Sequence, residues 1–329
     1  MVFAGDVMGH DMQITGAWRD GGDTSYNYHP VFQYIGDYIS AFDIALANLE
    51  VTLAGPPYKG YPEFSSHRSL AEALKNTGFN VLVTANNHSL DRGKKGLEST
   101  LNALDSIGIA HTGTFRDSAE WRANYPLIVE KNNFRLAILN YTYGTNGIPV
   151  AKPNVVSMID TAQIAADLGK AKSLKPDYII TCIHWGDEYQ NPENASQRAL
   201  AAFLAAHGTN LIIGSHPHVV QPLSTVNDSV YVIYSLGNFV SNQRDRYRDG
   251  GITLEATLIK KDGKATLKSV GYEPFYVYRC HENKKPPSVF RLIRINDYLK
   301  RPERYPAIDA ADKKLMMQFY NDTKATMGR

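Results

Sequence analysis

Side chains that could bind a metal ion follow the ends of several apolar, strand-like runs in this sequence. They lie in six short polar clusters, at residues 5–10, 48–50, 86–88, 184–187, 214–218 and 235–238. In an open α/β sheet, functional groups gather beyond the carboxyl ends of the strands, because loops from several strands converge there. Together the clusters therefore predict nitrogen and oxygen ligands for a two-metal site.

Three histidines are the most informative of these residues. His184 ends the run 178–183, where an isolated strand histidine is more often a structural residue than a ligand. His216 and His218 leave the apolar run 211–213 at positions i and i+2, and Pro217 enforces an irregular turn that could aim both rings at one region. Imidazole combined with carboxylate and amide oxygen suits zinc, manganese, iron or nickel more than calcium.

Two carboxylates and an Asn-Asn-His run complete the candidate ligands. Asp6 follows a glycine and could be an ordinary turn residue, and Glu50 could be a solvated carboxylate at the end of a strand. Residues 86–88 could form a loop held by asparagine side chains, but an asparagine carbonyl can also bind a metal, and His88 can exchange a proton near neutral pH. Because five separate strand ends each present a metal-binding residue type, their joint occurrence favours a metal site.

The elements that must position these residues alternate between strand-like and helical patterns. This order is typical of strand-helix-strand units around a parallel or mixed sheet, so the predicted fold class is α/β or α+β. The predicted strands are 2–7, 44–49, 80–85, 127–129, 136–141, 178–183, 211–213 and 230–235. The predicted helices are 30–39, 69–77, 94–106, 161–172 and 195–207, and Gly78, Gly108 and Gly208 suit left-handed caps after three of them.

The last third of the chain has a different pattern. Beyond residue 250, apolar and polar residues alternate up to an Asp-Gly turn at 262–263, which predicts a β-hairpin. Residues 284–287, Lys-Lys-Pro-Pro, are typical of a linker, and 309–326 have the pattern of an amphipathic helix. We therefore expect a main domain over 1–283 and a linker with a helical extension over 284–329.

Composition limits the classes of partner. The formal net charge of +2 provides no global field for gathering nucleic acid, so we expect no nucleic-acid partner, and an anionic ligand must be held locally. Cys182 and Cys280 are too few for a disulfide framework and suit core positions. No membrane span or basic-then-apolar leader is evident. Two localisations stay open: a cytoplasmic protein, or a mature extracytoplasmic domain whose leader or anchor is missing from this chain.

A basic segment follows the last polar cluster. Arg244, Arg246 and Arg248 could meet an anionic substrate, but Asp245 and Asp249 interleave with them. This alternation favours a solvated loop of mixed charge.

Residues 4–239 resemble the bacterial capsule-synthesis family, the CapA-like or poly-γ-glutamate synthesis proteins, which are similar to calcineurin-like metallophosphoesterases. Six motifs carry the resemblance in order along the chain: Gly-Asp-Val-Met, Asn-Leu-Glu, Ala-Asn-Asn-His, His-Trp-Gly-Asp-Glu-Tyr, Gly-Ser-His-Pro-His-Val-Val-Gln-Pro and Tyr-Ser-Leu-Gly-Asn-Phe. The segment after about residue 284 carries no part of it.

The resemblance implies a four-layer α-β-β-α sandwich of metallophosphoesterase type, with a C-terminal extension and one or two divalent metals at the strand ends. Asp6 and His218 would serve one metal, and Glu50 would stand in the bridging position. The ligands of the other metal would be Asn87, His184 and His216. His88 would occupy the position of the proton-donating histidine, steered by Asp91.

Two departures from the phosphoesterase pattern limit what the resemblance carries over. Met8 stands where a histidine is usual after Asp6, so the first metal is weak, absent or completed by His10, and Glu50 replaces an aspartate. His10 and Asn238 are thus further candidates for metal or substrate contact.

The function implied is a metal-dependent hydrolase in capsule or poly-γ-glutamate synthesis, with metal-activated water attacking a phosphoester or acyl centre. Its partners would be an anionic polymer or a small phosphorylated or acyl substrate, and membrane-bound polymer synthesis machinery in the cell envelope. The alternative is a non-catalytic polymer-binding or assembly factor with a degenerate metal site.

Overall fold

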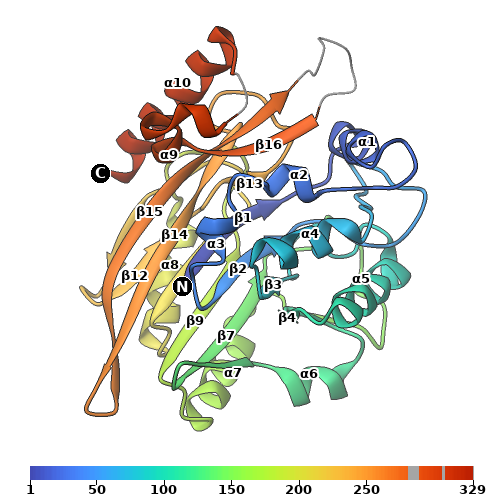
Figure 1. Ribbon diagram of the computed structural model, residues 1–329. Helices are drawn as coiled ribbons and strands as arrows, with labels where there is room; N and C mark the ends of the chain where they lie inside the picture. The colour runs from blue at the N-terminus through green and yellow to red at the C-terminus, as the bar shows by residue number, and fades with distance from the viewer. Residues whose placement is uncertain (281–288, 306–307, 329) are drawn as a thin grey trace.

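Two β-sheets lie face to face in the computed structural model, which describes residues 1–280, 289–305 and 308–328 (Figure 1). Helices cover the outer face of each sheet, so the order of layers is helix, sheet, sheet, helix. This is the predicted α-β-β-α sandwich.

The first sheet has the strand order β16-β15-β14-β1-β2-β3-β4, and β13 pairs with β1 beside this path. Strands β1 to β4 and β13 are parallel to one another, whereas β14 is antiparallel to β1, β15 to β14 and β16 to β15. The bounds are β1 (Val2–Val7), β2 (Ala45–Leu49), β3 (Val81–Val83), β4 (Ala110–Thr112), β13 (Asn238–Val240), β14 (Gly250–Lys261), β15 (Lys264–Cys280) and β16 (Val289–Arg294).

The second sheet has the strand order β11-β12-β10-β9-β7-β6, and its central strands β7, β9, β10 and β12 are parallel. The bounds are β6 (Leu127–Lys131), β7 (Phe134–Thr142), β9 (Tyr178–His184), β10 (Leu211–Ser215), β11 (Leu223–Val226) and β12 (Val230–Ile233). A separate small pair joins β5 (Thr114–Phe115) to β8 (Val155–Val156).

The strands alternate between two cores. In β1, Val2 belongs to the core under the helices, whereas Phe3 belongs to the core between the sheets. In β9, Ile180 faces the other sheet and Ile179 the outer helices. Because these central strands are buried on both faces, they read as nearly continuous apolar runs in the sequence.

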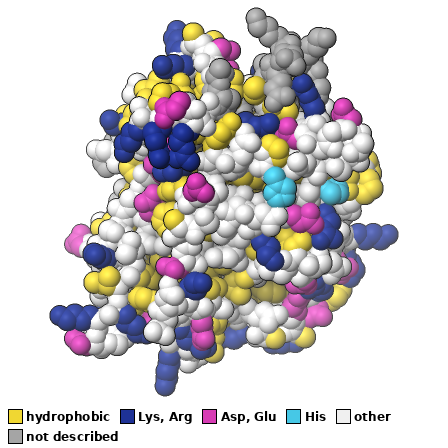
Figure 2. All heavy atoms as spheres, viewed as in Figure 1, with side chains coloured by type: hydrophobic (Ala, Val, Ile, Leu, Met, Phe, Trp, Pro, Cys, Tyr) yellow, Lys and Arg dark blue, Asp and Glu magenta, His cyan; other side chains and the backbone are white. Residues whose placement is uncertain are grey.

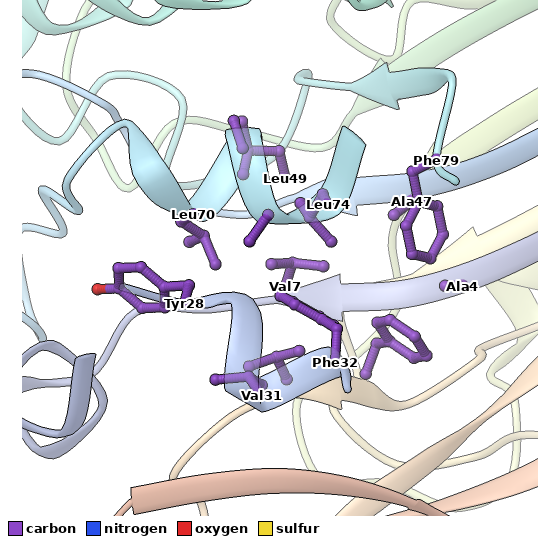
Figure 3. Close-up of a cluster of buried hydrophobic side chains, with 14 of the residues drawn as sticks. Ala4, Val7, Tyr28, Val31, Phe32, Ala47, Leu49, Leu70, Leu74 and Phe79 are labelled. Atoms are coloured by element: carbon purple, nitrogen blue, oxygen red, sulfur yellow. The ribbon is translucent and has the colours of Figure 1, made fainter. Parts of the chain in front are cut away.

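The helices on the first sheet enclose a dense apolar core. Figure 3 shows Val31, Phe32, Leu70 and Leu74 packed over Val7 and its neighbours in β1 and β2. The helices on this side are α1 (Asp11–Asp20), α2 (His29–Phe32), α3 (Gly36–Ile39), α4 (Ser69–Thr77) and α5 (Gly93–Ile107). The second sheet carries α6 (Ser118–Asn124), α7 (Thr161–Ser173) and α8 (Ala195–Ala206).

The C-terminal helices cover part of the first sheet that the second sheet leaves free. Met316 and Phe319 of α10 (Ala310–Met327) share the inter-sheet core with Ile252 and Tyr276 of β14 and β15 (Figure 1). Helix α9 (Ile295–Lys300) and the 3₁₀ turn η2 (Pro302–Arg304) precede α10. Asp309 caps α10 by accepting the N–H of Asp312.

Most predicted elements are present, with small shifts at their ends. The predicted helix 30–39 is wrong as a single element, because the chain forms α2 and α3 separated by a tight turn in which the N–H of Ile35 bonds to the carbonyl of Phe32. Gly78 and Gly108 adopt the predicted left-handed caps, and Gly208 has a φ of +105° just after α8. The elements that were not predicted are α1, α6, α9, η2, β4, β5, β8, β11, β13 and β16.

The predicted linker 284–287 and the boundary at 283/284 lie outside the described residues. Beyond them, β16 pairs antiparallel with β15, so the segment after the boundary adds a strand to the first sheet as well as helices. The division into a domain and an extension stays a prediction. In the part of the chain that the structure describes, no helix is long and apolar enough to cross a membrane.

Candidate metal centre

The carboxyl ends of parallel strands from both sheets meet at one buried site. The first sheet contributes residues from the ends of β1, β2 and β3, and the second sheet contributes residues from the ends of β9 and β10. All six predicted ligands are at most 3% exposed: Asp6, Glu50, Asn87, His184, His216 and His218. The structure therefore brings together side chains that are up to 212 positions apart in the sequence, from Asp6 to His218.

Glycine at position 5 allows β1 to present Asp6 at this site. A side chain on Gly5 would place its Cβ 2.1 Å from the carbonyl oxygen of Gly237. The backbones can thus approach closely enough for the N–H of Asp6 to donate to that same oxygen at 3.1 Å. Strand β13 is held against β1 by this contact, and Asn238 lies opposite Asp6.

The histidines and carboxylates form two groups that share Glu50. One group is Glu50, His184 and His216, and the other is Asp6, Glu50 and His218, each with its ligand atoms within 4.8 Å of one another. Oε1 of Glu50 lies 3.5 Å from Nε2 of His184 and 3.9 Å from Nε2 of His218. Glu50 therefore lies between two sets of nitrogen atoms, as a bridging ligand would.

The turn after β10 aims two of the histidines. His216 and His218 have φ values of +100° and +58°, a region that residues other than glycine seldom occupy. The N–H of His216 also donates to Oδ2 of Asp6 at 3.3 Å. The irregular turn expected around Pro217 is thus present, and surrounding contacts hold it. Such strained backbone is frequent at functional sites.

Asn87 joins the group that contains His184. Its Oδ1 lies 2.8 Å from Nε2 of His184, the same nitrogen that faces Glu50. Its Nδ2 donates to Oδ1 of Asn146 at 3.2 Å, which keeps the amide oxygen turned toward the site.

Asn48 and Ser215 contact two of the predicted ligands, Asp6 and His184. Nδ2 of Asn48 donates to Oδ1 of Asp6 at 2.8 Å and lies 3.3 Å from Nδ1 of His184. Oγ of Ser215 lies 3.1 Å from that Nδ1, so Nε2 is left to face Glu50. Partners of this kind fix the ring and tautomer of a ligand histidine. Both residues lie in the polar clusters of the sequence, but the sequence pattern alone predicted no role for them.

Charges from opposite sheets determine how Asp6 and His218 ionise. Burial opposes ionisation of Asp6, but the hydrogen bond and charge of His218 outweigh it and lower the pKa of Asp6 to about 2. Burial also opposes the charge on His218, yet Glu50 and Asp6 raise its pKa to about 9. The two side chains, 3.2 Å apart between Nδ1 and Oδ2, form a buried ion pair.

The remaining groups favour their neutral forms. Burial, followed by repulsion from Asp6, raises the pKa of Glu50 well above its usual value. Burial lowers the pKa of His184 to about 3, and burial with the neighbouring histidines lowers that of His216 to about 2. The two imidazoles are therefore neutral near pH 7, which is the form that binds metals.

Unpaired buried atoms indicate that a cation fits this site. Three atoms have no hydrogen-bond partner among the described residues: the two carboxylate oxygens of Glu50 and Nδ1 of His216. A buried polar atom without a partner is costly, and such exceptions call for a physical cause. A divalent cation would satisfy all three atoms, and the mixed nitrogen and oxygen donors suit manganese, zinc, iron or nickel.

His88 and Asp91 form a pair beside the two groups. Nδ1 of His88 lies 2.8 Å from Oδ2 of Asp91, which also accepts the N–H of Phe64 at 2.7 Å. Both side chains are buried, and burial, partly offset by His88, raises the pKa of Asp91. If Asp91 accepts the proton on Nδ1, Nε2 is the ring nitrogen left for proton exchange.

The two additional candidates have other contacts. His10 belongs to neither of the two groups found among the described residues, and its Nδ1 lies 3.0 Å from Oε1 of Gln13 and accepts the N–H of Asn242. Oδ1 of Asn238 faces Nδ1 of His218 at 3.1 Å, so Asn238 is placed to orient that histidine. Met8 is buried in the core under the helices.

Two tyrosines at the site were not among the residues predicted from the sequence. The ring of Tyr143 lies 4.6 Å from that of His216, and the ring of Tyr189 lies 6.0 Å from that of His218. They are 46% and 41% exposed, in contrast to the buried ligands. Tyr143 directly follows β7, and Tyr189 lies five residues after His184 at the end of β9. These positions were the available signal in the sequence, but aromatic residues beside strands usually cover core edges.

Comparison with known proteins places these observations in a family. The family described as "Bacterial capsule synthesis protein PGA_cap" matches residues 1–243. The "PGA biosynthesis protein CapA" of Bacillus subtilis (strain 168) is 30% identical over 253 residues, which cover 71% of this chain and 62% of that protein. The "Capsule biosynthesis protein CapA" of Bacillus anthracis is 29% identical over 257 residues, with 74% and 60% covered. The match thus spans less than two thirds of either relative's length.

Among solved structures, the fold resembles a calcineurin-like phosphoesterase. The structure of calcineurin-like phosphoesterase YfkN from Bacillus subtilis aligns with a TM-score of 0.52 and 14% sequence identity, over 100% of this chain and 98% of that one. At this identity the likeness concerns the fold alone, and it agrees with the four layers described above.

Proposed function

This chain belongs to the bacterial capsule synthesis protein family PGA_cap, and we propose that within it the protein acts as a metal-dependent hydrolase on a surface polymer. The observation that carries the proposal is the pair of ligand groups sharing Glu50, whose two oxygens are buried without a hydrogen-bond partner among the described residues. A structural carboxylate would be paired with donors.

Six side chains would hold one or two divalent ions: Asp6, Glu50, Asn87, His184, His216 and His218. An ion bound there supplies Lewis acidity for a phosphoryl or carbonyl oxygen and lowers the pKa of water toward 7. The enclosed position of the ligands strengthens their electrostatic effect on a substrate, because the effective dielectric is lower than in water.

His88 is the proposed proton donor to the leaving group. Asp91 orients the ring through Nδ1, and the N–H of Phe64 holds Asp91 in place. A positioned acid of this kind typically contributes 10²- to 10⁴-fold to the rate.

The names of the relatives support the proposed substrate and setting. The curated relatives carry names in capsule and PGA biosynthesis, so we propose an anionic polymer, or a small phosphorylated or acyl compound, as substrate. Membrane-bound polymer synthesis machinery in the cell envelope is the proposed partner. On the face shown in Figure 2, basic and acidic side chains are interspersed apart from a cluster of Lys and Arg, so a polymer would be held locally.

A second candidate is a polymer-binding or assembly factor without turnover. It is favoured by the group around Asp6, which has Met8 in the core and His10 turned to Gln13 and therefore contains only three histidine or acidic ligands among the described residues. A weakly held ion at that position would bind an anion without completing a reaction.

Metal analysis combined with an activity assay tests both candidates. Purified protein should contain a divalent transition metal, and His216→Ala should lose most of it, whereas the matched control His207→Ala, just after α8 and bonded to the carbonyl of Phe203, should retain it. Normal metal content in His216→Ala would contradict the ligand set.

Turnover then separates a hydrolase from a binding factor. With a phosphodiester or a γ-glutamyl polymer fragment, His88→Ala should lower the rate by about 10²- to 10⁴-fold without changing metal content. His111→Ala is the matched control, because His111 pairs with Asp105 at 3.0 Å outside both ligand groups. Metal-loaded protein that turns over neither substrate would support the binding factor.

A further inference from the structure

A loop beyond the family match extends to the edge of the metal centre. The match ends at residue 243, and the next residues connect β13 to β14. The guanidinium carbon of Arg248 lies 4.0 Å from the centre of the Tyr189 ring, and that ring lies 6.0 Å from the ring of His218. One tyrosine ring thus separates an arginine from a proposed metal ligand.

The backbone holds Tyr189 in this place. Its φ is +66°, which is uncommon for a residue other than glycine, and its N–H donates to the carbonyl of Pro217 at 2.8 Å. Pro217 lies between the two proposed ligands His216 and His218, so the position of Tyr189 is linked to theirs. Tyr189 is 41% exposed, and it is therefore available to a ligand as well as to Arg248.

Asn238 ties Arg248 to the same centre. Its Nδ2 donates to the carbonyl of Arg248 at 2.8 Å and to Oε1 of Gln243 at 3.0 Å, while its Oδ1 faces Nδ1 of His218 at 3.1 Å. The outer side of the loop is fixed by a two-point ion pair between Arg246 and Asp322 of α10, at 2.9 and 2.8 Å. The loop is anchored at both the metal centre and the C-terminal helix.

We infer that Arg248, stacked on Tyr189, binds a carboxylate of an acidic polymer whose neighbouring unit lies at the metal centre. This inference rests on the proposed function. A guanidinium has a planar set of donors that matches a carboxylate and it stacks on aromatic rings, so the pair offers both features of such a site. A polymer with a carboxylate on each unit would place one of them next to the reacting unit.

Asp245 forms an ion pair with Arg248, and a substrate carboxylate would have to replace it. Its Oδ2 lies 2.5 Å from Nη2 of Arg248, but the Asp245 side chain is 74% exposed, whereas that of Arg248 is 23% exposed. An exposed carboxylate is readily solvated, so a substrate carboxylate can replace it at low cost. The mixed charge of the loop, which in the sequence favoured a merely solvated segment, is thus compatible with anion binding.

Equilibrium binding of γ-linked hexaglutamate to the metal-loaded protein tests this inference. Arg248→Ala should weaken binding about 10-fold or more, because a hydrogen bond to a charged group is lost. Arg248→Lys should keep part of the affinity, and Asp245→Asn should tighten binding several-fold by removing the competing carboxylate. Arg135→Ala is the matched control, since Arg135 pairs with Glu130 at the opposite end of the second sheet and should leave affinity unchanged.

Two further ligands distinguish recognition of a carboxylate from binding to the peptide backbone or to any anion. The γ-linked hexamer with α-carboxamides in place of the α-carboxylates has the same backbone without the side charges, and Arg248→Ala should not change its affinity. Inorganic phosphate should bind wild type and Arg248→Ala equally. Equal affinities of wild type and Arg248→Ala for hexaglutamate would overturn the inference, and so would a loss of affinity for the carboxamide hexamer as large as that for hexaglutamate. If Arg248→Ala weakened the binding of phosphate as much as that of hexaglutamate, the assignment to a carboxylate would be overturned.

Failure of this inference is distinguishable from failure of the proposed function. A wild-type protein that does not bind hexaglutamate would overturn the role of Arg248. The metal content of His216→Ala and the turnover of His88→Ala would still test the metal-dependent hydrolase, because neither measurement depends on the loop after Asn238.

Discussion

The two sheets contribute different chemistry to the candidate metal centre. The strand ends of the first sheet supply the proposed oxygen ligands, from Asp6, Glu50 and Asn87, together with the His88–Asp91 pair. The strand ends of the second sheet supply three imidazoles, from His184, His216 and His218. Neither set is a complete site, and it is the packing of one sheet on the other that creates the mixed ligand set.

The side chains at the strand ends of the first sheet form the oxygen half of the site, and those of the second sheet form the imidazole half. The contact between the two halves also determines the charges of Asp6 and Glu50. Asp6 is ionised because His218 of the other sheet lies beside it. Burial, followed by repulsion from Asp6, raises the pKa of Glu50, whose two oxygens have no hydrogen-bond partner among the described residues. Separated from each other, the oxygen half would hold two carboxylates of like charge and the imidazole half three buried rings. Each half therefore depends electrostatically on the other or on a bound cation.

The largest expected effect comes from the residue common to both ligand groups. Glu50→Gln should lower metal affinity more than about 100-fold at both positions, because changes to outer partners alone cost 10- to 100-fold. Metal content after dialysis measures this, with Glu72→Gln on the exposed face of α4 as control. Loss of metal from only one position would show that Glu50 serves one half.

A smaller effect is expected at the contact between the halves. Asn48→Ala removes the donor to Asp6 and the neighbour of His184, so metal affinity should fall about 10- to 100-fold in a folded protein. Asn80 directly precedes β3, and its side chain bonds to the backbone of Asp43 and Ala45 at the start of β2, so Asn80→Ala should not change metal affinity. Titration with a competing chelator measures both, and equal effects would mean that Asn48 has only a structural role.

The smallest effect concerns the metal-free protein and separates histidines within the imidazole half. His216 has a folded-state pKa of about 2, below the unfolded value of 6.5, so its contribution to stability is complete above pH 6.5 and is lost as the pH falls toward 2. His218 has a folded-state pKa of about 9, so its contribution is complete below pH 6.5 and is lost as the pH rises through 9. Each changes the free energy of unfolding by about 1.4 kcal/mol per pH unit within its window.

Denaturant unfolding in chelator between pH 5 and 8.5 measures these slopes. Relative to wild type, His216→Gln should gain stability as the pH falls below 6.5, and His218→Gln should gain stability as the pH rises above 6.5. Parallel curves for the three proteins would show that neither histidine changes its pKa on folding, contrary to the structure.

The local features of the site were predictable. The run of residues 211–213 followed by His-Pro-His indicates a strand end, and the structure has β10 ending at Ser215 with both histidines beyond it. The hairpin around the Asp-Gly turn at 262–263 is likewise confirmed by the pairing of β14 with β15. Both follow from short-range rules of periodicity and turn chemistry.

Other residues were not predictable because their roles depend on distant contacts. Asn48 becomes important only through Asp6 and His184, which lie in different sheets. Arg248 is one of several arginines in a mixed-charge segment, and only the fold places it over Tyr189. The role of each predicted ligand in binding a metal stays a prediction, although the structure brings all six together.

The sequence by itself determined the alternation of strands and helices, the strand ends that carry polar residues, and the types of ligand available there, because these depend on neighbouring residues. Only the tertiary structure decided that carboxylate and amide oxygens of one sheet meet imidazoles of the other around Glu50, and that the loop with Arg248 lies beside them. The distance between two strand ends depends on how the sheets stack, and that stacking is a collective result of burying the core between them.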